Sequence, residues 1–301
     1  EVLEICDRIS ILRAGEIVGD ADPKTASNKE LASMMVGRPV NLSLDRTTSK
    51  PGNTLLEVRG LSVLNEKQDT AVSNISFNVK EGEILGVAGV QGNGQTELVD
   101  AITGLRPKLS GEILYFGENM NTISPRKIHQ IGIRHIPEDR QKSGIIGNFT
   151  VSENLILNNY YASPYSNNYA MDWSKVNDES ERIIHKFDIR TPSANTLAEN
   201  LSGGNQQKLV VGREMSDDVD FLIASQPTRG IDVGSIEYIH EQLIESRNHG
   251  KGILLVSTEL EEILTLSDRI IVLFRGEIID EFDTNPTPEE IGLAMAGHPR
   301  K

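Results

Sequence analysis

The segment Leu201-Ser202-Gly203-Gly204-Asn205-Gln206-Gln207-Lys208 lies in the second half of this 301-residue chain. Its sequence strongly constrains the fold. Ser202 is a residue type that caps helix N-termini, and Gly203 and Gly204 allow another molecule to approach the backbone closely. We expect a helix to continue from this point through Met215. A helix N-terminus with a serine hydroxyl and bare backbone N–H groups suits a phosphate presented from outside the domain.

A second glycine-rich segment, Gly89-Val90-Gln91-Gly92-Asn93-Gly94-Gln95-Thr96, follows a buried strand and opens a helix that Gly104 closes. In that context glycines let successive backbone N–H groups converge on phosphate oxygens, and the helix dipole adds positive potential. The segment therefore predicts a phosphate-binding P-loop with Thr96 as the Mg²⁺ ligand. Its members are Gly89, Gly92, Asn93, Gly94, Gln95, Thr96 and Glu97.

The P-loop pattern requires lysine before the Ser/Thr position, and this chain has Gln95 there. A neutral amide can donate a hydrogen bond to a phosphate oxygen but contributes no charge at the β- and γ-phosphates. We therefore expect weak triphosphate binding and less stabilisation of a transferring phosphoryl group. Taken alone, the segment is also compatible with a purely structural turn between strand and helix.

Apolar runs and alternations predict strands on both sides of these two segments. The expected strands are Leu55–Val58, Ile75–Val79, Glu83–Ala88, Phe221–Ala224, Ile253–Val256 and Arg269–Phe274. Between them, the stretch from Asn154 to Glu199 has weaker strand signals and several helical ones. Strands that alternate with helices in this way predict an α/β fold with a largely parallel, covered sheet.

Composition narrows the class of protein. The chain has 38% hydrophobic and 25% charged residues, as ordinary globular proteins do. A formal net charge of −14 argues against a general nucleic-acid binder, but not against a nucleotide site built locally from backbone N–H groups. The lone cysteine, Cys6, excludes a disulfide framework and fits a reducing cytosol. No apolar run approaches the roughly 18–20 residues that a membrane-spanning helix needs.

Residues 1–40 recur near the end of the chain, as in a duplicated domain. For example, the tripeptide Asp7-Arg8-Ile9 recurs 261 residues later as Asp268-Arg269-Ile270. The recurrence includes charged and glycine positions, and a period near 260 residues exceeds any solenoid repeat. We interpret residues 1–40 as the end of a first domain copy, 41–53 as a linker and 54–301 as a second copy. One domain with two similar hairpins remains the alternative.

Four motifs together resemble the ABC ATPase family, and within it the tandem-cassette importers for simple sugars and nucleosides. They are Leu201–Lys208, Ile136-Pro137-Glu138-Asp139-Arg140, Thr150–Leu155 and Pro227–Gly234. The resemblance implies a P-loop NTPase with a RecA-like core, a small antiparallel β subdomain and a helical subdomain inserted at about 137–215. It also implies a signature segment that contains Leu201, Ser202, Gly203, Gly204, Asn205 and Gln206.

The chain has the residues expected of the family at some motif positions and different residues at others. The strand that should end in Asp-Glu ends in Ser225-Gln226, which orient a metal ion and polarise water poorly. The position that is usually histidine is Thr258, after Ser257, and the loop position that is usually glutamine is Glu138. The aromatic expected to stack on adenine near residues 64–69 is absent. The signature and the D-loop residues Gly230 and Asp232 remain.

Cassettes of this family dimerise head to tail, so that each ATP lies between one P-loop and the other cassette's signature. The resemblance therefore implies that this cassette donates its signature to the first cassette of the same chain, whereas its own ATP and Mg²⁺ site is weak or absent. It further implies a transmembrane permease partner, an extracellular substrate-binding protein and a peripheral place on the cytoplasmic face of the membrane. A stand-alone competent ABC ATPase and a soluble non-transport ABC protein are the alternatives.

The transported substrate is the least constrained expectation. The segment Ala224-Ser225-Gln226-Pro227-Thr228-Arg229-Gly230 resembles the corresponding segment in the degenerate second cassettes of nucleoside importers. Sugar importers of the same subfamily more often keep Asp-Glu at positions 225 and 226. The resemblance therefore favours a nucleoside over a simple sugar.

Overall fold

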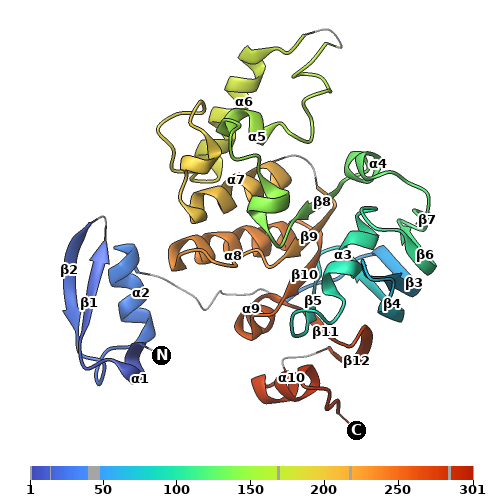
Figure 1. The fold of residues 1–301 in the computed structure, drawn as a ribbon, viewed down its shortest axis with the longest axis horizontal. Helices are drawn as coiled ribbons and strands as arrows, with labels where there is room; N and C mark the ends of the chain where they lie inside the picture. Colours follow the sequence, from blue (N-terminus) through green and yellow to red (C-terminus); the bar gives the residue numbers. More distant parts are fainter. Residues whose placement is uncertain are drawn as a thin grey trace.

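The computed structural model describes residues 2–13, 15–39, 48–167, 170–216, 219–283 and 286–300 (Figure 1). The strands are β1 Ile9–Arg13, β2 Glu16–Ala21, β3 Thr54–Leu64, β4 Thr70–Lys80, β5 Ile84–Ala88, β6 Lys108–Tyr115, β7 Glu118–Asn119, β8 Ile133–Ile136, β9 Phe221–Ser225, β10 Gly252–Ser257, β11 Arg269–Phe274 and β12 Glu277–Phe282. The α-helices are α1 Val2–Ile5, α2 Asn28–Val36, α3 Gln95–Ile102, α4 Pro125–Gln130, α5 Val151–Leu155, α6 Trp173–Lys186, α7 Gly203–Met215, α8 Val233–Asn248, α9 Leu260–Leu266 and α10 Pro288–Met295. Two short helices complete the list, the π-helix η1 Arg140–Gly144 and the 3₁₀-helix η2 Ala198–Asn200.

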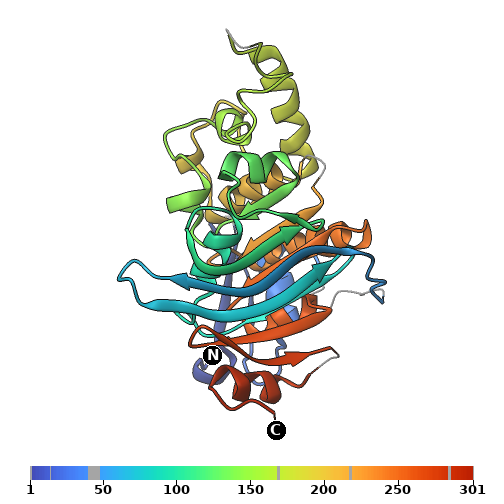
Figure 2. The same ribbon diagram turned by 90° about the vertical axis from the view of Figure 1, so that its right-hand side faces the viewer.

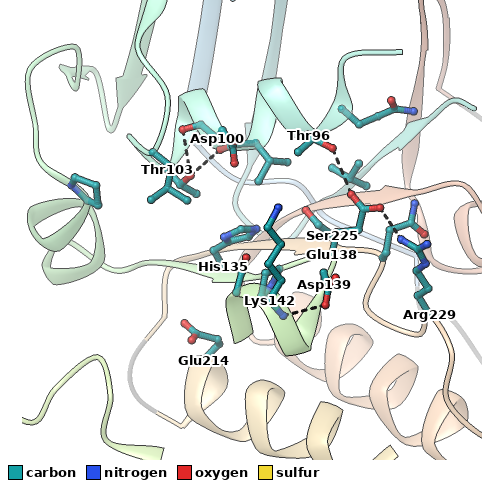
Figure 3. A pocket seen from close by; sticks show the side chains of 18 of the residues that line it. Thr96, Asp100, Thr103, His135, Glu138, Asp139, Lys142, Glu214, Ser225 and Arg229 are labelled. Carbon is teal, nitrogen blue, oxygen red and sulfur yellow. Dashed lines mark hydrogen bonds and ion pairs between the residues drawn. The ribbon is translucent and has the colours of Figure 1, made fainter. Parts of the chain in front are cut away.

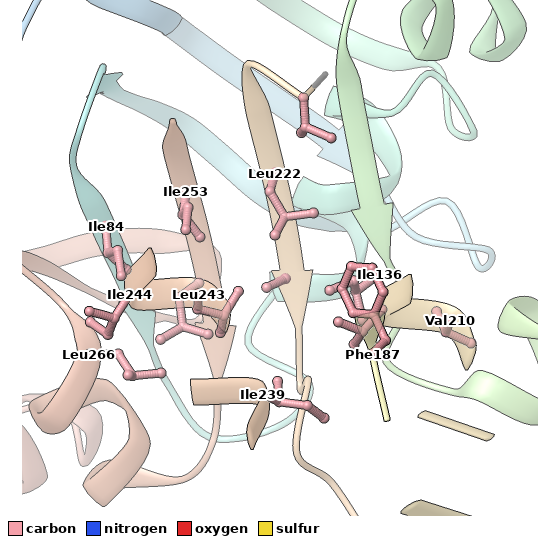
Figure 4. Packing of buried hydrophobic residues seen from close by; sticks show 14 of the residues in the cluster. Ile84, Ile136, Phe187, Val210, Leu222, Ile239, Leu243, Ile244, Ile253 and Leu266 are labelled. Atoms are coloured by element: carbon pink, nitrogen blue, oxygen red, sulfur yellow. The ribbon is translucent and has the colours of Figure 1, made fainter. Parts of the chain in front are cut away.

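A six-stranded sheet in the order β12-β11-β5-β10-β9-β8 forms the centre of the molecule. All its neighbouring pairs are parallel except β11 and β12. Strands β5, β9 and β10 are buried along their whole length, which explains their continuous apolar sequences. Helices α7, α8 and α9 cover one face, where Leu222, Leu243 and Ile253 pack together (Figure 4). The predicted α/β fold with a covered parallel sheet is confirmed.

A second sheet, in the antiparallel order β4-β3-β6-β7, lies on the other side of α3. Figure 2 shows its long strands β3 and β4 crossing in front of the central sheet. Leu98 and Ile102 of α3 are fully buried in the core that joins α3 to strands of both sheets. The helix that follows the P-loop is therefore held between two sheets.

The segment between β8 and β9 is helical, with η1, α5, α6, η2 and α7 and no named strand among its described residues. It rises above the central sheet in Figure 1. Its buried side chains, such as Phe187 and Val210, join the same core as those of α8. Asn168, the last residue of a polar stretch in this segment, lies outside the described residues.

The first hairpin repeats the last one in structural detail. In β1–β2 the register shifts between Ile11 and Leu12, and in β11–β12 it shifts at the equivalent place, between Val272 and Leu273. Both hairpins are followed by a helix with a capping box, formed by Ser27 and Glu30 before α2 and by the corresponding Thr287 and Glu290 before α10. The sequence repeat therefore corresponds to a repeated supersecondary unit.

Several elements differ from the sequence expectations. The first two strands run well beyond Leu55–Val58 and Ile75–Val79, to residues 54–64 and 70–80, with several register shifts. Helix α3 agrees with the expectation, since it runs from Gln95 to Ile102 and is followed by Gly104 with a φ of +72°. Of the predicted linker, residues 41–47 lie outside the described residues.

Candidate functional site

The carboxyl ends of four parallel strands meet at one edge of the central sheet. Ala88 of β5 pairs with Ser257 of β10, and Val256 of β10 pairs with Ser225 of β9. The P-loop leaves β5 here, and Glu138 follows β8 two residues after its end. Ligands of open α/β sheets bind outside the carboxyl ends of the strands. The structure thus brings together the predicted residues of the P-loop with 138, 225, 226 and 258.

The P-loop is shaped by close backbone contacts. Gly94 has a φ of +104° and N-caps α3 in the left-handed region. A Cβ added there would lie 2.4 Å from the carbonyl oxygen of Ala71, so only glycine fits this turn. Asn93 fixes the other side, since its Oδ1 accepts a hydrogen bond from the backbone N–H of Arg275 at 2.7 Å.

The side chain of Gln95 turns back onto the loop that it follows. Its Oε1 accepts a hydrogen bond from the backbone N–H of Asn93 at 3.1 Å, and its Nε2 donates to the carbonyl oxygen of Val90 at 3.1 Å. Gln95 is buried. The amide therefore satisfies polar groups of the loop itself, in the place where the P-loop pattern has a lysine.

Glu138 lies opposite the start of α3 and connects three segments (Figure 3). Its Oε2 accepts a hydrogen bond from the Thr96 hydroxyl at 3.3 Å. Its Oε1 accepts from Gln91 Nε2 at 3.0 Å and pairs with Arg229 Nη1 at 2.7 Å. A carboxylate thus stands beside the hydroxyl that the sequence assigned to Mg²⁺, and the same carboxylate pairs with the Arg229 guanidinium.

The positions expected to orient water and metal form a neutral group. Ser225 is buried, and its Oγ has no hydrogen-bond partner within the described part of the chain. The amide of Gln226 and the hydroxyl of Thr258 hydrogen-bond each other, at 3.2 Å from Nε2 and 3.3 Å from Oε1. None of the three side chains is a base or carries a charge at neutral pH. These three positions therefore contribute hydroxyl and amide groups to the site, but neither a carboxylate nor an imidazole.

The signature segment begins α7 at the surface. Ser202 is exposed and N-caps the helix, and its Oγ accepts hydrogen bonds from the N–H and Nδ2 of Asn205 at 3.4 and 2.9 Å. The three residues that follow are anchored inside the molecule. Gln206 donates to Ala198 O, Gln207 to Pro227 O and Lys208 to Asp188. These anchors explain why the motif continues past the two glycines.

A cavity of about 600 Å³ opens beside the P-loop and runs toward the helical segment (Figure 3). Thr96, Glu138 and Ser225 line one end, and His135 and Glu214 line the other. Burial lowers the pKa of the His135 imidazole, so the ring is neutral at neutral pH. The cavity therefore extends well beyond the space beside the P-loop glycines.

Comparison with known proteins supplies the family. Residues 72–229, more than half of the chain, match the family model described as ABC transporter. The chain belongs to the ABC transporter family. The match ends within the segment Pro227–Asp232, which contains the predicted D-loop residues Gly230 and Asp232, and it includes the P-loop and the signature.

Three curated relatives are similar to this chain over nearly its whole length. The chain is 45% identical over 99% of its length to the guanosine import ATP-binding protein NupO of Bacillus subtilis, and covers 58% of that protein. It is 42% identical to the nucleoside import ATP-binding protein NupA of Lactococcus lactis, again over 99% of this chain and 59% of the relative. It is 39% identical to the glucose import ATP-binding protein TsgD13 of Haloferax volcanii, over 99% of this chain and 54% of the relative. The chain thus spans less than three fifths of the length of these relatives.

Solved structures agree on the fold. An ATP-binding cassette of an ABC transporter in its ADP conformation superimposes with a TM-score of 0.66 at 21% identity, over 81% of this chain and 96% of that one. A dimeric cassette in a post-hydrolysis state with ADP and Pi gives a TM-score of 0.65 at 22% identity, over 76% and 98%. The family fold, a P-loop NTPase, is therefore present here.

Sequence reasoning located the positions of the site but missed several of their contacts. The pairing of Glu138 with Arg229 and Gln91 was not predicted, nor was the internal bonding of Gln95. Arg140 also approaches this region and contacts the backbone of residues 229 and 230. Its presence in the motif Ile136–Arg140 was the available signal. A helix that could span a membrane is not found in the part of the chain that the structure describes.

Proposed function

We propose that this chain is the second cassette of a tandem ATP-binding subunit, preceded by the end of the first cassette. Two observations support the boundary at residue 40. The first hairpin has the register and the bulge of β11–β12, yet β1 pairs with β2 alone among the described strands, whereas β11 also pairs with β5. Leu12 is 66% exposed and its counterpart Leu273 is fully buried. The missing neighbour of β1 is then a strand of the first cassette's central sheet.

We infer that the cassette donates its signature and does not hydrolyse nucleotide at its own P-loop. The observation that carries this inference is the contrast between the two glycine-rich segments. Ser202, which caps α7, is exposed, and Gln206, Gln207 and Lys208 after it are anchored inside the molecule. Gln95, in contrast, is hydrogen-bonded to its own loop. Ser225, Gln226 and Thr258 supply neither a carboxylate nor an imidazole. The partner-facing part of the site is kept and the cassette's own catalytic part is lost.

A membrane permease is the proposed partner of the helical segment. Ile146, Phe149 and Leu197 are apolar, 39%, 38% and 36% exposed, and adjacent through the bond from Ala198 N–H to Phe149 O at 2.9 Å. An exposed apolar group of this kind suits a protein partner. The relatives are named import ATP-binding proteins. We therefore place the subunit at the cytoplasmic face of the membrane, with an extracellular substrate-binding protein acting through the permease.

We propose a nucleoside as the transported substrate. The support is the wording of residues 224–230 together with the names of the two relatives at 45% and 42% identity, which are guanosine and nucleoside import proteins. The glucose and ribose import proteins are 39% identical or less. Uptake of labelled guanosine and ribose by the reconstituted transporter tests this choice. Guanosine uptake is expected, and uptake of ribose alone would contradict it.

ATP hydrolysis by purified residues 1–301 tests the loss of the cassette's own activity. We expect no turnover above the background of a sample that carries the additional substitution Thr96→Ala. Turnover at about 1 s⁻¹ or more, a rate within the ordinary range of enzymes, would contradict the proposal. Co-purification of the full-length protein with a permease distinguishes an importer from a non-transport ABC protein.

A further inference from the structure

The segment from Pro227 to Asp232, which contains the D-loop, is held by side chains from two neighbouring helices. Gln207 of α7 donates from Nε2 to the carbonyl oxygen of Pro227 at 2.8 Å, and the Gln207 side chain is buried. The hydroxyl of Thr228 donates to the buried carboxylate of Glu262 on α9 at 2.7 Å. The start of the segment is therefore attached to the signature helix on one side and to α9 on the other.

Arg140 holds the middle of the same segment. Its Nη1 donates to the carbonyl oxygen of Arg229 at 2.9 Å, and its Nη2 lies 3.4 Å from the carbonyl oxygen of Gly230. A planar guanidinium can span two neighbouring carbonyl groups, which an ammonium cannot do in one geometry. Arg140 opens η1, two residues after Glu138, and reaches the D-loop across 89 residues of sequence.

The same guanidinium also lies against the signature. A Cβ added at Gly203 would be 2.8 Å from Arg140 Nη2, and a Cβ added at Gly204 would be 2.6 Å from Asp232 Oδ2. Gly203 thus lies directly against the Arg140 guanidinium, and Gly204 lies directly against the D-loop carboxylate of Asp232. The start of α7, Arg140 and residues 229–232 form one contiguous surface unit, which we call the signature–D-loop unit.

We infer that Arg140 is a positioning residue for ATP hydrolysis at the partner cassette's site. It keeps Ser202 and Asp232 in fixed relative positions, so that both meet the partner as one unit. Its neighbour Glu138 contacts both Thr96 and Arg229, at 3.3 and 2.7 Å, so the same short segment joins this unit to the degenerate P-loop. The inference rests on the proposed donation of the signature to the first cassette.

The test uses the full-length tandem protein in complex with its permease and compares Arg140→Ala, Arg140→Lys and the exposed control Arg59→Ala. We expect Arg140→Ala to lower kcat for ATP about tenfold or more, because small misplacements of a site are costly, with KM within about twofold of wild type. Arg140→Lys stays close to Arg140→Ala, since one ammonium does not bridge both carbonyls, and Arg59→Ala equals wild type. The melting temperature changes by less than about 2 °C for all three variants, because the contacts of Arg140 lie at the surface.

Two results for Arg140→Ala would overturn the inference. One is a kcat of Arg140→Ala within about twofold of wild type, and the other is a lost kcat accompanied by a melting temperature lower by more than about 5 °C, the sign of a general loss of stability. Ser202→Ala, measured in parallel, separates the inference from the proposal beneath it. If Ser202→Ala abolishes turnover and Arg140→Ala does not lower it, only the role of Arg140 fails. If Ser202→Ala retains full turnover, the donated signature fails and the inference fails with it.

Discussion

At the scale of single residues, Gln95 is the clearest departure from an ordinary P-loop. A lysine at this position places an ammonium at the β- and γ-phosphates. Gln95 instead accepts from Asn93 N–H and donates to Val90 O, so a phosphate must compete with an internal partner for the Asn93 amide. The neutral side chain also leaves the phosphate charge uncompensated.

We predict that Gln95→Lys strengthens ATP binding to residues 1–301 by about tenfold, the effect of one hydrogen bond to a charged group. The variant remains without hydrolysis, because Ser225 and Gln226 are unchanged. Titration calorimetry measures the affinity and phosphate release measures the turnover. Gln95→Met is the control that removes the internal hydrogen bonds without adding charge. Turnover restored by Gln95→Lys alone would mean that residues 225 and 226 do not limit the site.

The sequence alone identifies the family positions at which this chain has an unusual residue, because the motifs place these positions relative to neighbouring glycines and strands. The contacts of these residues cannot be predicted in this way, since they depend on residues far apart in the chain. Glu138 and Arg229 are 91 positions apart and meet at 2.7 Å only because β8 and β9 end side by side. The resemblance to the family placed Glu138 at the loop position that is usually glutamine, and nothing in the local sequence indicated its pairing with an arginine.

At the scale of elements, the chain contains the same hairpin and helix twice, in two different environments. Ser27 before α2 and Thr287 before α10 each form a capping box with a glutamate three residues later. Helix α10 packs on α9 and β11, and its Ile291 is fully buried. In helix α2 only Ala32 is buried, and in the hairpin that precedes α2 the side chain of Ile17 is 69% exposed. The two helices therefore begin with the same capping interaction, but only α10 packs into the core.

We predict that Thr287→Ala lowers the free energy of unfolding of the cassette by about 1 kcal/mol, the usual effect of losing an N-cap. Ser27→Ala, its matched control, leaves the main unfolding transition within about 0.3 kcal/mol of wild type, since α2 is not part of the cassette core. Urea denaturation followed by the fluorescence of Trp173 or by circular dichroism measures both. Equal destabilisation by the two substitutions would show that the N-terminal hairpin folds as part of the cassette.

Element types were predicted better than element lengths. Continuous apolar runs identified β5, β9 and β10, which are buried on both faces. Strand β3 was predicted as four residues and has eleven, because register shifts around Gly60 interrupt the alternation. Strand β8 was missed, since Arg134 and His135 make its four residues look polar although the strand lies in the central sheet. Two polar residues in four thus concealed a strand of the central sheet.

At the scale of the whole molecule, the edge of β1 with which no described strand pairs supports the proposed separation of the N-terminal hairpin from the cassette. The hairpin contacts the cassette through α2 and α8, and Arg38 pairs with the buried carboxylate of Glu237 at 2.6 Å. On its other edge β1 has no partner among the described strands, although its sequence counterpart β11 lies between two strands.

We predict that the backbone amides of β1 exchange with deuterium within seconds to minutes in residues 1–301, and at least about 100-fold more slowly in the full-length tandem protein. An edge strand opens locally at little cost, whereas a strand inside a sheet opens only with the core. Hydrogen–deuterium exchange followed by mass spectrometry compares the peptides that cover residues 9–21. The amides of β11 provide the internal control and exchange slowly in both proteins. Equal protection of β1 in both would contradict a missing neighbouring strand.

The central claim, that the cassette serves its partner's ATP and not its own, is tested most directly by ATP turnover of the full-length tandem protein with Ser202→Ala or Thr96→Ala. We predict that Ser202→Ala lowers turnover about 100-fold or more, the size of effect known for the loss of one donor to a transition state. Thr96→Ala, at the degenerate P-loop, should lower turnover by less than about threefold, because no hydrolysis occurs there. The reverse ranking, with Thr96→Ala the damaging substitution, would contradict the account.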